Sequence, residues 1–327
     1  MQPPLDPHEK PPESLKALYK RYQKADAVTL EADDSIVCLD ALPSESWRRV
    51  DRFTTSDVQQ ALRAFHRGAE LRESSVNAFV EAYESKDIPV AVQQQLLSYT
   101  FHRDLSIDQH KTNVHFHHDI SYPFDRRSFF DYDPSRTDFL TPKDSVTHKQ
   151  LSLGQFFNRR LRWLTLGGQY DWTAKQYPNE RPPTFPAELG DLLQGVFPET
   201  RAEAAIVNLY SPGDVLSLHR DVSEFCDRGL ISLSIGCDGV FMLGGAHQRP
   251  EEPSKCLAIR LRSGDAVYMT GPSRYAWHGV PQIIAHTCPT ALQAWPASMA
   301  AEDTTYEQWR NWMASKRINL NVRQMYQ

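Results

Sequence analysis

The stretch LISLSIGCDGVFMLGG at residues 230–245 contains two short apolar runs, 230–236 and 239–245, separated by Cys237 and Asp238. Short runs of apolar and β-branched residues bounded by glycine, proline, serine or aspartate are typical of β-strands. Six more runs of this kind lie around it: LRWLTLGG at 161–168, EAAIVNLY at 203–210, VLSLH at 215–219, CLAIRL at 256–261, DAVYMT at 265–270 and INLNV at 318–322. Such closely spaced short strands predict an antiparallel sandwich or barrel and not a doubly wound parallel sheet.

Helical patterns dominate the N-terminal third. Four residues recur at helical spacing opposite lysine and arginine side chains, and they predict a short basic amphipathic helix: Leu15, Leu18, Tyr19 and Tyr22. We expect this helix to dock on the main body in preference to serving as a nucleic-acid arm. A second helix is predicted from a Ser56 cap through Val58, Leu62 and Phe65. A third is predicted to begin at Ile88-Pro89 and to bury Val92, Leu96 and Leu97.

Composition shifts divide the chain into four regions. Residues 1–14 are rich in proline and are predicted to be disordered, and residues 15–103 form a mostly helical N-terminal extension. Residues 104–149 are polar, aromatic and punctuated by proline without a sustained period, so we expect a long loop or insert there. The β-rich core occupies residues 150–327.

The overall composition narrows the class of protein. Of 327 residues, 40% are hydrophobic and 24% are charged, which is ordinary for a globular chain, and no apolar run is long enough to span a membrane. No secretory or transit signal is visible, so we expect the cytoplasm and/or the nucleus, a monomer, and reduced thiols at the five scattered cysteines. A net charge of -5 argues against a protein that coats nucleic acid but leaves a local basic groove possible.

A histidine and a carboxylate share one strand face near the middle of the core. In VLSLHRDV at 215–222, the two-residue period of a strand places His219 and Asp221 on the same side. His278 follows the strand-like run 265–270 and is the leading candidate for a second histidine. Two histidines and one carboxylate leave three positions of an octahedral iron open, which an oxygenase needs for a chelating cosubstrate and O2. The sequence therefore indicates a metal site at His219, Asp221 and His278.

Other interpretations of the histidines remain open. The HxD pattern occurs at His102/Asp104, His117/Asp119 and His219/Asp221, so the pattern alone is weak. His115 and His117 also share a strand face and form a second candidate pair. Zinc accepts histidine and carboxylate ligands as well, so the ligand types alone do not exclude a zinc hydrolase.

The run RINLNVR at 317–323 alternates between polar and apolar residues. Its polar members Arg317, Asn319, Asn321 and Arg323 face one side, and its apolar members face the other. Arginines inside a small barrel are costly unless they serve a ligand or each other, so this strand suggests carboxylate recognition. The alternative is a half-solvated edge strand.

These residues resemble the AlkB family of Fe(II)- and 2-oxoglutarate-dependent dioxygenases. Three motifs occur in the family's order: NLYSPGDVLSLHRD at 208–221, SGDAVYMTGPSRYAWHG at 263–279 and RINLNVR at 317–323. The segments LRWLTLGGQYDWTAKQYP at 161–178 and RAEAAIVNLY at 201–210 are similar to the eukaryotic type-one branch of the family. The resemblance implies an α+β, mainly β fold, with a double-stranded β-helix (jelly-roll) core behind a helical N-terminal extension.

The resemblance also implies a site. His219, Asp221 and His278 would bind Fe(II), and Asn208 and Tyr210 would contact 2-oxoglutarate. Arg317 would pair with the distal carboxylate of 2-oxoglutarate, and Arg323 would hold its end near the metal and brace Asp221. With O2 and 2-oxoglutarate as cosubstrates, the implied reaction is oxidative demethylation that releases formaldehyde, succinate and CO2.

The implied substrate is an N-methylated nucleobase, N6-methyladenine or N1-methyladenine, in RNA, tRNA or DNA. Trp172 stands where the family has an aromatic residue that stacks the base, Tyr170 would assist it, and Arg162 would meet a phosphate. The chain departs from the DNA-repair members at Ser223, where they have an acidic residue; Glu224 follows it here. The alternative is a protein (histone-tail) hydroxylase or demethylase with the same iron chemistry, which the negative net charge favours mildly.

Overall fold

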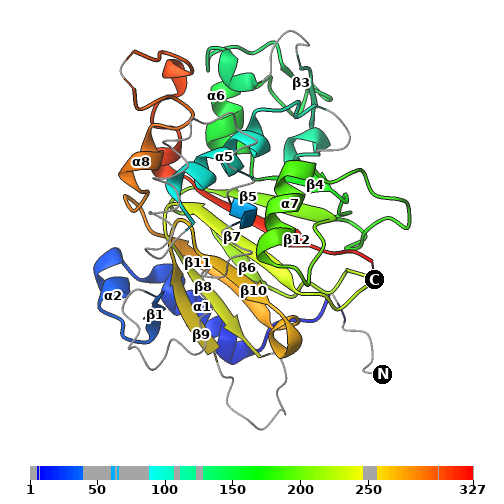
Figure 1. Ribbon diagram of the computed structural model, residues 1–327, viewed down its shortest axis with the longest axis vertical. Helices are drawn as coiled ribbons and strands as arrows, with labels where there is room; N and C mark the ends of the chain where they lie inside the picture. The colour runs from blue at the N-terminus through cyan, green and yellow to red at the C-terminus, as the bar shows by residue number, and fades with distance from the viewer. Residues whose placement is uncertain are drawn as a thin grey trace.

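Two five-stranded sheets form the centre of the molecule (Figure 1). The computed structural model describes residue 6 and residues 8–39, 60–62, 65, 88–106, 111–122, 128–245, 256–300 and 302–326. The first sheet contains, in order, β1 (Ile36–Cys38), β9 (Cys256–Leu261), β8 (Gly239–Gly244), β11 (Trp277–Ile283) and β6 (Leu216–His219). The second contains β10 (Ala266–Met269), β7 (Leu230–Gly236), β12 (Arg317–Arg323), β5 (Ala204–Tyr210) and β4 (Trp163–Gly167). All eight strand-like runs of the sequence are strands, and the predicted jelly-roll sandwich is confirmed.

The strand β1 was not predicted. It lies in the N-terminal extension, which the sequence describes as mostly helical, and it pairs in parallel with β9. All other neighbouring strands of the two sheets are antiparallel. A strand of three residues is too short for an alternating pattern to reveal it.

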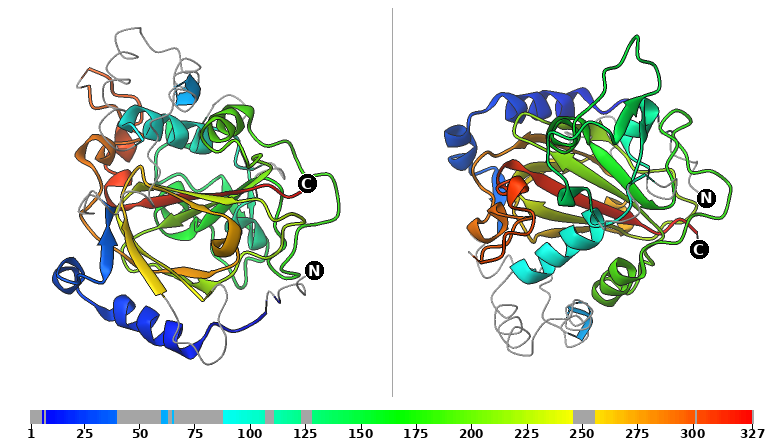
Figure 2. Two further views of the ribbon diagram at one scale, coloured as in Figure 1. Left: turned by 60° about the horizontal axis from the view of Figure 1, so that its bottom comes forward. Right: turned by 90° about the horizontal axis from the view of Figure 1, so that it is seen from above.

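Alternation along β12 determines what lies between the sheets. Ile318, Leu320 and Val322 belong to one buried apolar cluster with leucines of the helices α5 (Val90–Phe101) and α7 (Ala187–Val196), which cover the outer face of the second sheet. Because successive strand residues point to opposite faces, the polar residues of β12 point toward the first sheet. The sandwich therefore has a polar interior on this side, and the left panel of Figure 2 shows the two sheets as facing layers.

The helix α1 (Glu13–Lys24) packs on the outer face of the first sheet, as predicted. Tyr19 and Tyr22 are buried in a second apolar cluster with Val240 and Met242 of β8. The short helix α2 (Ala27–Glu31) adds Leu30 to the same cluster. In the left panel of Figure 2, α1 lies on the opposite side of the sandwich from α5.

The segment 104–149, predicted as a polar loop or insert, has some structure of its own. It contains two 3-10 helices, η4 (Asn113–Phe116) and η5 (Phe129–Asp131), and the strands β2 (His118–Ile120) and β3 (Leu140–Pro142), which pair with each other. Phe129 and Phe130 are fully buried in the main core. Aromatic anchors such as these fix a segment without producing any regular sequence period.

The remaining short elements connect the sheets. They are α6 (Leu153–Gln155), the π-helix η6 (Phe156–Arg160), α8 (Thr290–Gln293), and the 3-10 helices η7 (Gly271–Ser273), η8 (Glu307–Trp309) and η9 (Met313–Ser315). Five cysteines are free. Among the described helices, none has the length and apolar character needed to cross a bilayer.

Two predictions fall partly outside the described residues. Ser56 and Val58 of the predicted second helix lie outside them, whereas Leu62 and Phe65 are helical and buried. In the predicted disordered segment 1–14, residues 1–5 and 7 lie outside them, and α1 already begins at Glu13. The third predicted helix corresponds to α5, which begins directly after Pro89.

Candidate metal centre

Two adjacent strands of the first sheet carry the predicted metal ligands. His219 is the last residue of β6, and Asp221 follows it by two positions. His278 lies in β11, directly opposite His219 in the antiparallel pairing of the two strands. Gly279 allows these strands to approach, because a Cβ there would lie only 2.8 Å from the Leu216 carbonyl oxygen. The sheet register thus brings together the three residues that the sequence singled out.

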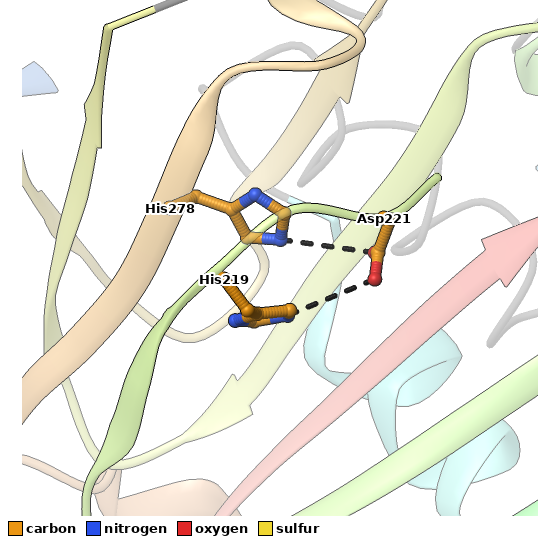
Figure 3. Close-up of side chains that lie close together, drawn as sticks. All are labelled: His219, Asp221 and His278. Carbon is orange, nitrogen blue, oxygen red and sulfur yellow. Dashed lines mark ion pairs between the residues drawn. The ribbon is translucent and has the colours of Figure 1, made fainter. Parts of the chain in front are cut away.

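The three side chains converge on one point (Figure 3). Nε2 of His219 lies 3.7 Å from Oδ1 of Asp221, and Nε2 of His278 lies 3.7 Å from Oδ2 of Asp221. One ligand atom from each residue falls within 4.8 Å of the others, and no other such group occurs in the described part of the chain. Metal–ligand bonds of about 2.0–2.2 Å require ligand atoms separated by distances of this order. The spacing suits a single cation held between the three residues.

Hydrogen bonds fix both imidazole rings with Nε2 toward that point. Nδ1 of His219 lies 2.9 Å from the Ser217 carbonyl oxygen, and Nδ1 of His278 lies 3.0 Å from the Ala276 carbonyl oxygen. A carbonyl oxygen only accepts, so each Nδ1 carries the proton and each Nε2 keeps its lone pair. Nε2 of His278 is buried and has no hydrogen-bond partner among the described residues. A buried acceptor without a partner is costly, and a metal ion would satisfy it.

Charge around Asp221 favours its ionised form. Burial alone would raise its pKa, but Arg323 and the two histidines hold the pKa of the carboxyl far below its usual range. Nη2 of Arg323 donates to Oδ2 at 2.8 Å, and Nδ2 of Asn321 donates to the same oxygen at 3.3 Å. Burial, with the nearby His219, lowers the pKa of His278 to about 4. Asp221 is thus anionic and His278 neutral, which are the forms that bind a divalent cation.

Arg317 offers unused donors inside the sandwich. Its side chain is 1% exposed, and Nη2 donates to the Ser234 hydroxyl at 2.8 Å. Nε and Nη1 of Arg317 and the hydroxyl of Tyr210 have no partner within the described chain. Burial lowers the pKa of this guanidinium, yet arginine stays protonated in proteins. A buried cation with two unpartnered donor nitrogens fits an anionic carboxylate.

Asn208 and Tyr210, which the resemblance places at the cosubstrate, lie on β5 opposite the polar residues of β12. Asn208 is opposite Asn319 of β12, and Tyr210 is opposite Arg317. The guanidinium carbon of Arg317 lies 5.7 Å from the centre of the Tyr210 ring. Tyr210 thus lies beside Arg317, and Asn208 lies two positions before Tyr210 on the same face of β5.

Three residues for which the sequence predicted no role in the site brace this arrangement: Arg274, Glu224 and Tyr177. Arg274 donates to the backbone oxygen of Asp221 at 2.6 Å and to Glu224 at 2.7 Å. Oε1 of Glu224 also lies 3.2 Å from Nε of Arg323, and Nη1 of Arg323 donates to the Tyr177 hydroxyl at 3.0 Å. Glu224 is therefore a buried counter-ion and not an acidic group at the surface. Its position directly after the unusual Ser223 is the one local signal that pointed to it.

The predicted substrate residues form an aromatic path that leads to Arg323. Trp172 is 38% exposed, and its ring contacts Tyr170 edge-on at 4.9 Å. The ring of Tyr170 lies 5.3 Å from that of Tyr177, the phenol bonded to Arg323. Arg162, the predicted phosphate contact, is half exposed and pairs with Asp214.

The other histidine patterns have different surroundings. His102 bonds to the Ser128 hydroxyl at 2.8 Å and stacks on Tyr306, while Asp104 accepts from Ser106. His115 bonds to the backbone of Thr112. The ring of His117 lies against His148 at 4.4 Å. None of these histidines belongs to a ligand group of three in the described chain.

Comparison with known proteins gives a consistent result. A family model described as the 2OG-Fe(II) oxygenase superfamily matches residues 128–323. The chain is 43% identical to N6-methyladenosine RNA demethylase ALKB1 of Pyricularia oryzae, over 98% of each chain. It is 52% identical to N6-methyladenosine RNA demethylase ALKBH of Cryphonectria parasitica, over 65% of this chain and 99% of that protein. It is 45% identical to tRNA demethylase abh1 of Schizosaccharomyces pombe, over 54% of this chain and 57% of that protein.

Proposed function

The chain belongs to the AlkB family within the 2OG-Fe(II) oxygenase superfamily, and from that premise we propose that it removes N-methyl groups from nucleobases in nucleic acid. The observation that carries the proposal is the meeting of His219, Asp221 and His278 beside the buried, under-bonded Arg317. Relatives named for demethylation of N6-methyladenosine in RNA and of tRNA supply the substrate class. N6-methyladenine is our first candidate and N1-methyladenine in tRNA the second.

One set of residues would bind the metal ion, and another set would bind the cosubstrate. His219, Asp221 and His278 would hold Fe(II), which with 2-oxoglutarate and O2 bound supplies an oxidant able to hydroxylate a C–H bond. Arg317 would bind the distal carboxylate of 2-oxoglutarate, with Asn208 and Tyr210 beside it. Arg323 would keep Asp221 ionised and hold the cosubstrate end near the metal.

The net reaction balances with one O2. One oxygen atom enters succinate as 2-oxoglutarate loses CO2, and the other enters a C–H bond of the N-methyl group. The resulting N-hydroxymethyl group breaks its C–N bond to release formaldehyde and leaves an N–H on the base.

The aromatic path gives the base a place to lie. A base must leave its stack to reach a buried metal, and an exposed indole face compensates it for the lost stacking. Trp172 and Tyr170 would supply that face. The side chain of His219 is 35% exposed, against 3% for His278, so the site is open on the His219 side.

The experiment measures succinate and formaldehyde together, with Fe(II) and 2-oxoglutarate, on methylated single-stranded RNA, tRNA, DNA and methylated histone-tail peptides. We expect formaldehyde equal to succinate on a nucleic acid and none in an Asp221→Ala control. Products only on peptides would favour the alternative of a histone-tail hydroxylase or demethylase. Succinate without formaldehyde on every substrate would overturn demethylation.

A further inference from the structure

The aromatic path continues outward beyond Trp172. The ring of Trp163 lies 4.9 Å from that of Trp172, and Phe116 contacts Trp163 edge-on at 5.9 Å. His117 follows Phe116 at 6.4 Å, and His148 lies 4.4 Å from His117. We call Trp163, Phe116, His117 and His148 the outer stripe. The proposed function uses none of these four residues.

The outer stripe presents ring surface to solvent. Phe116 is 58% exposed, and Trp172, where the stripe meets the inner path, is 38% exposed. Three of the described phenylalanine, tyrosine and tryptophan residues are exposed, Phe116, Trp172 and Phe225, and the first two lie on this one line of rings. A single exposed apolar residue needs no explanation, but two exposed rings joined through the partly buried Trp163 form a continuous aromatic surface.

Hydrogen bonds to backbone groups fix the two segments that carry the outer stripe. Oδ1 of Asn113 accepts from the backbone N–H groups of Arg162 at 2.8 Å and Trp163 at 3.2 Å, and its Nδ2 donates to the Arg160 carbonyl oxygen at 2.8 Å. The Lys111 carbonyl oxygen accepts from the Thr165 N–H at 2.8 Å. These bonds fasten η4, which carries Phe116, alongside β4, which carries Trp163. The rings are thus ordered before any ligand arrives, which lowers the entropic cost of binding.

Positive charge accompanies the stripe. Lys143 donates to the His115 carbonyl oxygen at 2.7 Å and lies 3.8 Å from Asp119, so its ammonium is held next to the histidines. Lys111, Arg159 and Arg160 are exposed on the segments that Asn113 and Thr165 tie together. Rings flanked by lysine and arginine are the combination that single-stranded nucleic acid requires, because bases stack on rings while phosphates meet cations.

We propose that the outer stripe binds the unpaired bases adjacent to the methylated base in a single-stranded nucleic acid. The inference rests on the proposed function, which places the methylated base at Trp172. The outer stripe begins beside that residue and leads away from Arg323 and Asp221. A duplex would hide its base faces in stacking, so the stripe selects strands that are single or locally open. Trp172 takes the target base, and Trp163 and Phe116 take its neighbours.

The experiment compares binding and turnover in Phe116→Ala. Binding is followed by fluorescence anisotropy with an unmethylated single-stranded RNA of about 15 nucleotides, without 2-oxoglutarate. We expect Kd to rise about tenfold in Phe116→Ala, and to stay near wild type in Phe116→Trp, which retains a ring. Met299→Ala, which removes a side chain of similar exposure (60%) that has no place on the stripe, should leave Kd unchanged.

Turnover adds a length-dependent readout. On a methylated RNA of the same length, KM should rise in Phe116→Ala while kcat stays constant, because the ring acts only on binding. On a methylated mononucleotide, which has no neighbouring base to place on Trp163 or Phe116, the KM values of wild type and Phe116→Ala should be equal.

Failure of this proposal is distinguishable from failure of the proposed function. If the wild type demethylates RNA but Phe116→Ala has unchanged Kd and KM, the outer stripe is not a nucleic-acid surface and serves another partner, such as a protein. If the wild type demethylates nothing, the anisotropy series with unmethylated RNA still decides the matter. An unchanged Kd in Phe116→Ala overturns the inference in either case.

Discussion

Nη2 of Arg323 donates a hydrogen bond to Oδ2 of Asp221 at 2.8 Å and so joins β12 of the second sheet to the segment directly after β6 of the first sheet. Both side chains are largely buried, with 3% and 14% of their surface exposed. The bond therefore connects β12, which carries Arg317 and Arg323, to the candidate metal ligands. The positive charge of Arg323 also keeps Asp221 ionised, so a residue of the second sheet sets the charge of a candidate metal ligand beside the first sheet.

Removal of this arginine should be costly. In Arg323→Leu the Asp221 carboxylate loses its main counter-ion in a buried place, so we expect the free energy of unfolding to fall by about 3–5 kcal/mol. Arg162→Leu, which removes a half-exposed pair with Asp214, should cost no more than about 1 kcal/mol. Urea denaturation of the metal-free proteins measures both. Equal small losses would mean that the Arg323 pair contributes no more than a surface pair.

Arg317 should determine the response to 2-oxoglutarate. A ligand at about 100 times its Kd stabilises a folded protein by about 2.7 kcal/mol. We expect 2-oxoglutarate, with Mn²⁺ in place of iron to prevent turnover, to raise the Tm of the wild type and not that of Arg317→Leu. Lys316→Gln is the matched control, because it alters the neighbouring buried cation, which bonds to Asn158 and Ser211. A normal Tm shift in Arg317→Leu would remove Arg317 from the cosubstrate site.

His102 should make the free energy of unfolding decrease as the pH falls below about 6.5. Burial lowers its pKa from 6.5 to about 4, so below pH 6.5 the unfolded chain takes up a proton that the folded protein does not. Stability is therefore complete above about pH 6.5 and falls as the pH drops toward 4, by about 2–3 kcal/mol from this residue. His102→Gln should flatten that part of the profile, measured as the urea midpoint against pH. An unchanged slope would show that His102 does not titrate in this way.

Tyr19 should hold the ligand strands in register. Its hydroxyl lies 3.0 Å from the Leu216 carbonyl oxygen of β6 and 3.3 Å from the Val280 carbonyl oxygen of β11, next to the irregular pairing after His278. We expect Tyr19→Phe to cost about 1–2 kcal/mol of stability and to weaken metal binding, measured by calorimetric titration with Mn²⁺.

The matched control for Tyr19 is Tyr22→Phe. Tyr22 lies on the same helix and is also buried, but its hydroxyl bonds to Ser35 within the N-terminal extension. It should lose stability without losing metal affinity. Equal metal affinity in both variants would make Tyr19 a purely structural residue.

The features that the sequence revealed are those with a local pattern. The strands β7 and β9 correspond to apolar runs between turn residues, and His219, Asp221 and Arg317 stand at positions where strand alternation fixes the side-chain direction. Two-residue periodicity therefore predicted that His219 and Asp221 share a face and that Arg317 and Arg323 do. The close spacing of short strands predicted the sandwich, and the roles of Asn208 and Tyr210 came only from the resemblance to the AlkB family.

The features that it missed depend on partners far away in the sequence. Nothing in the sequence around Arg274 indicates that its side chain reaches the backbone of Asp221. Nothing around Tyr19 indicates that its hydroxyl reaches the carbonyl oxygens of Leu216 and Val280, which lie 197 and 261 residues away in the sequence. The sequence likewise does not indicate that the ring of Phe116 lies beside that of Trp163 on β4. Such contacts arise from tertiary packing, which local propensity does not encode.

The most direct test of the central claim follows one carbon atom. Single-stranded RNA with a carbon-13 label in the N6-methyl group of adenine is incubated with the protein, Fe(II), 2-oxoglutarate and O2. The carbon-13 formaldehyde released from the RNA and the unlabelled succinate formed from 2-oxoglutarate are then quantified. We expect equal amounts of the two products from the wild type and neither from His278→Ala. Labelled formaldehyde from His278→Ala at the wild-type rate, or succinate from the wild type with the label still on the RNA, would contradict that claim.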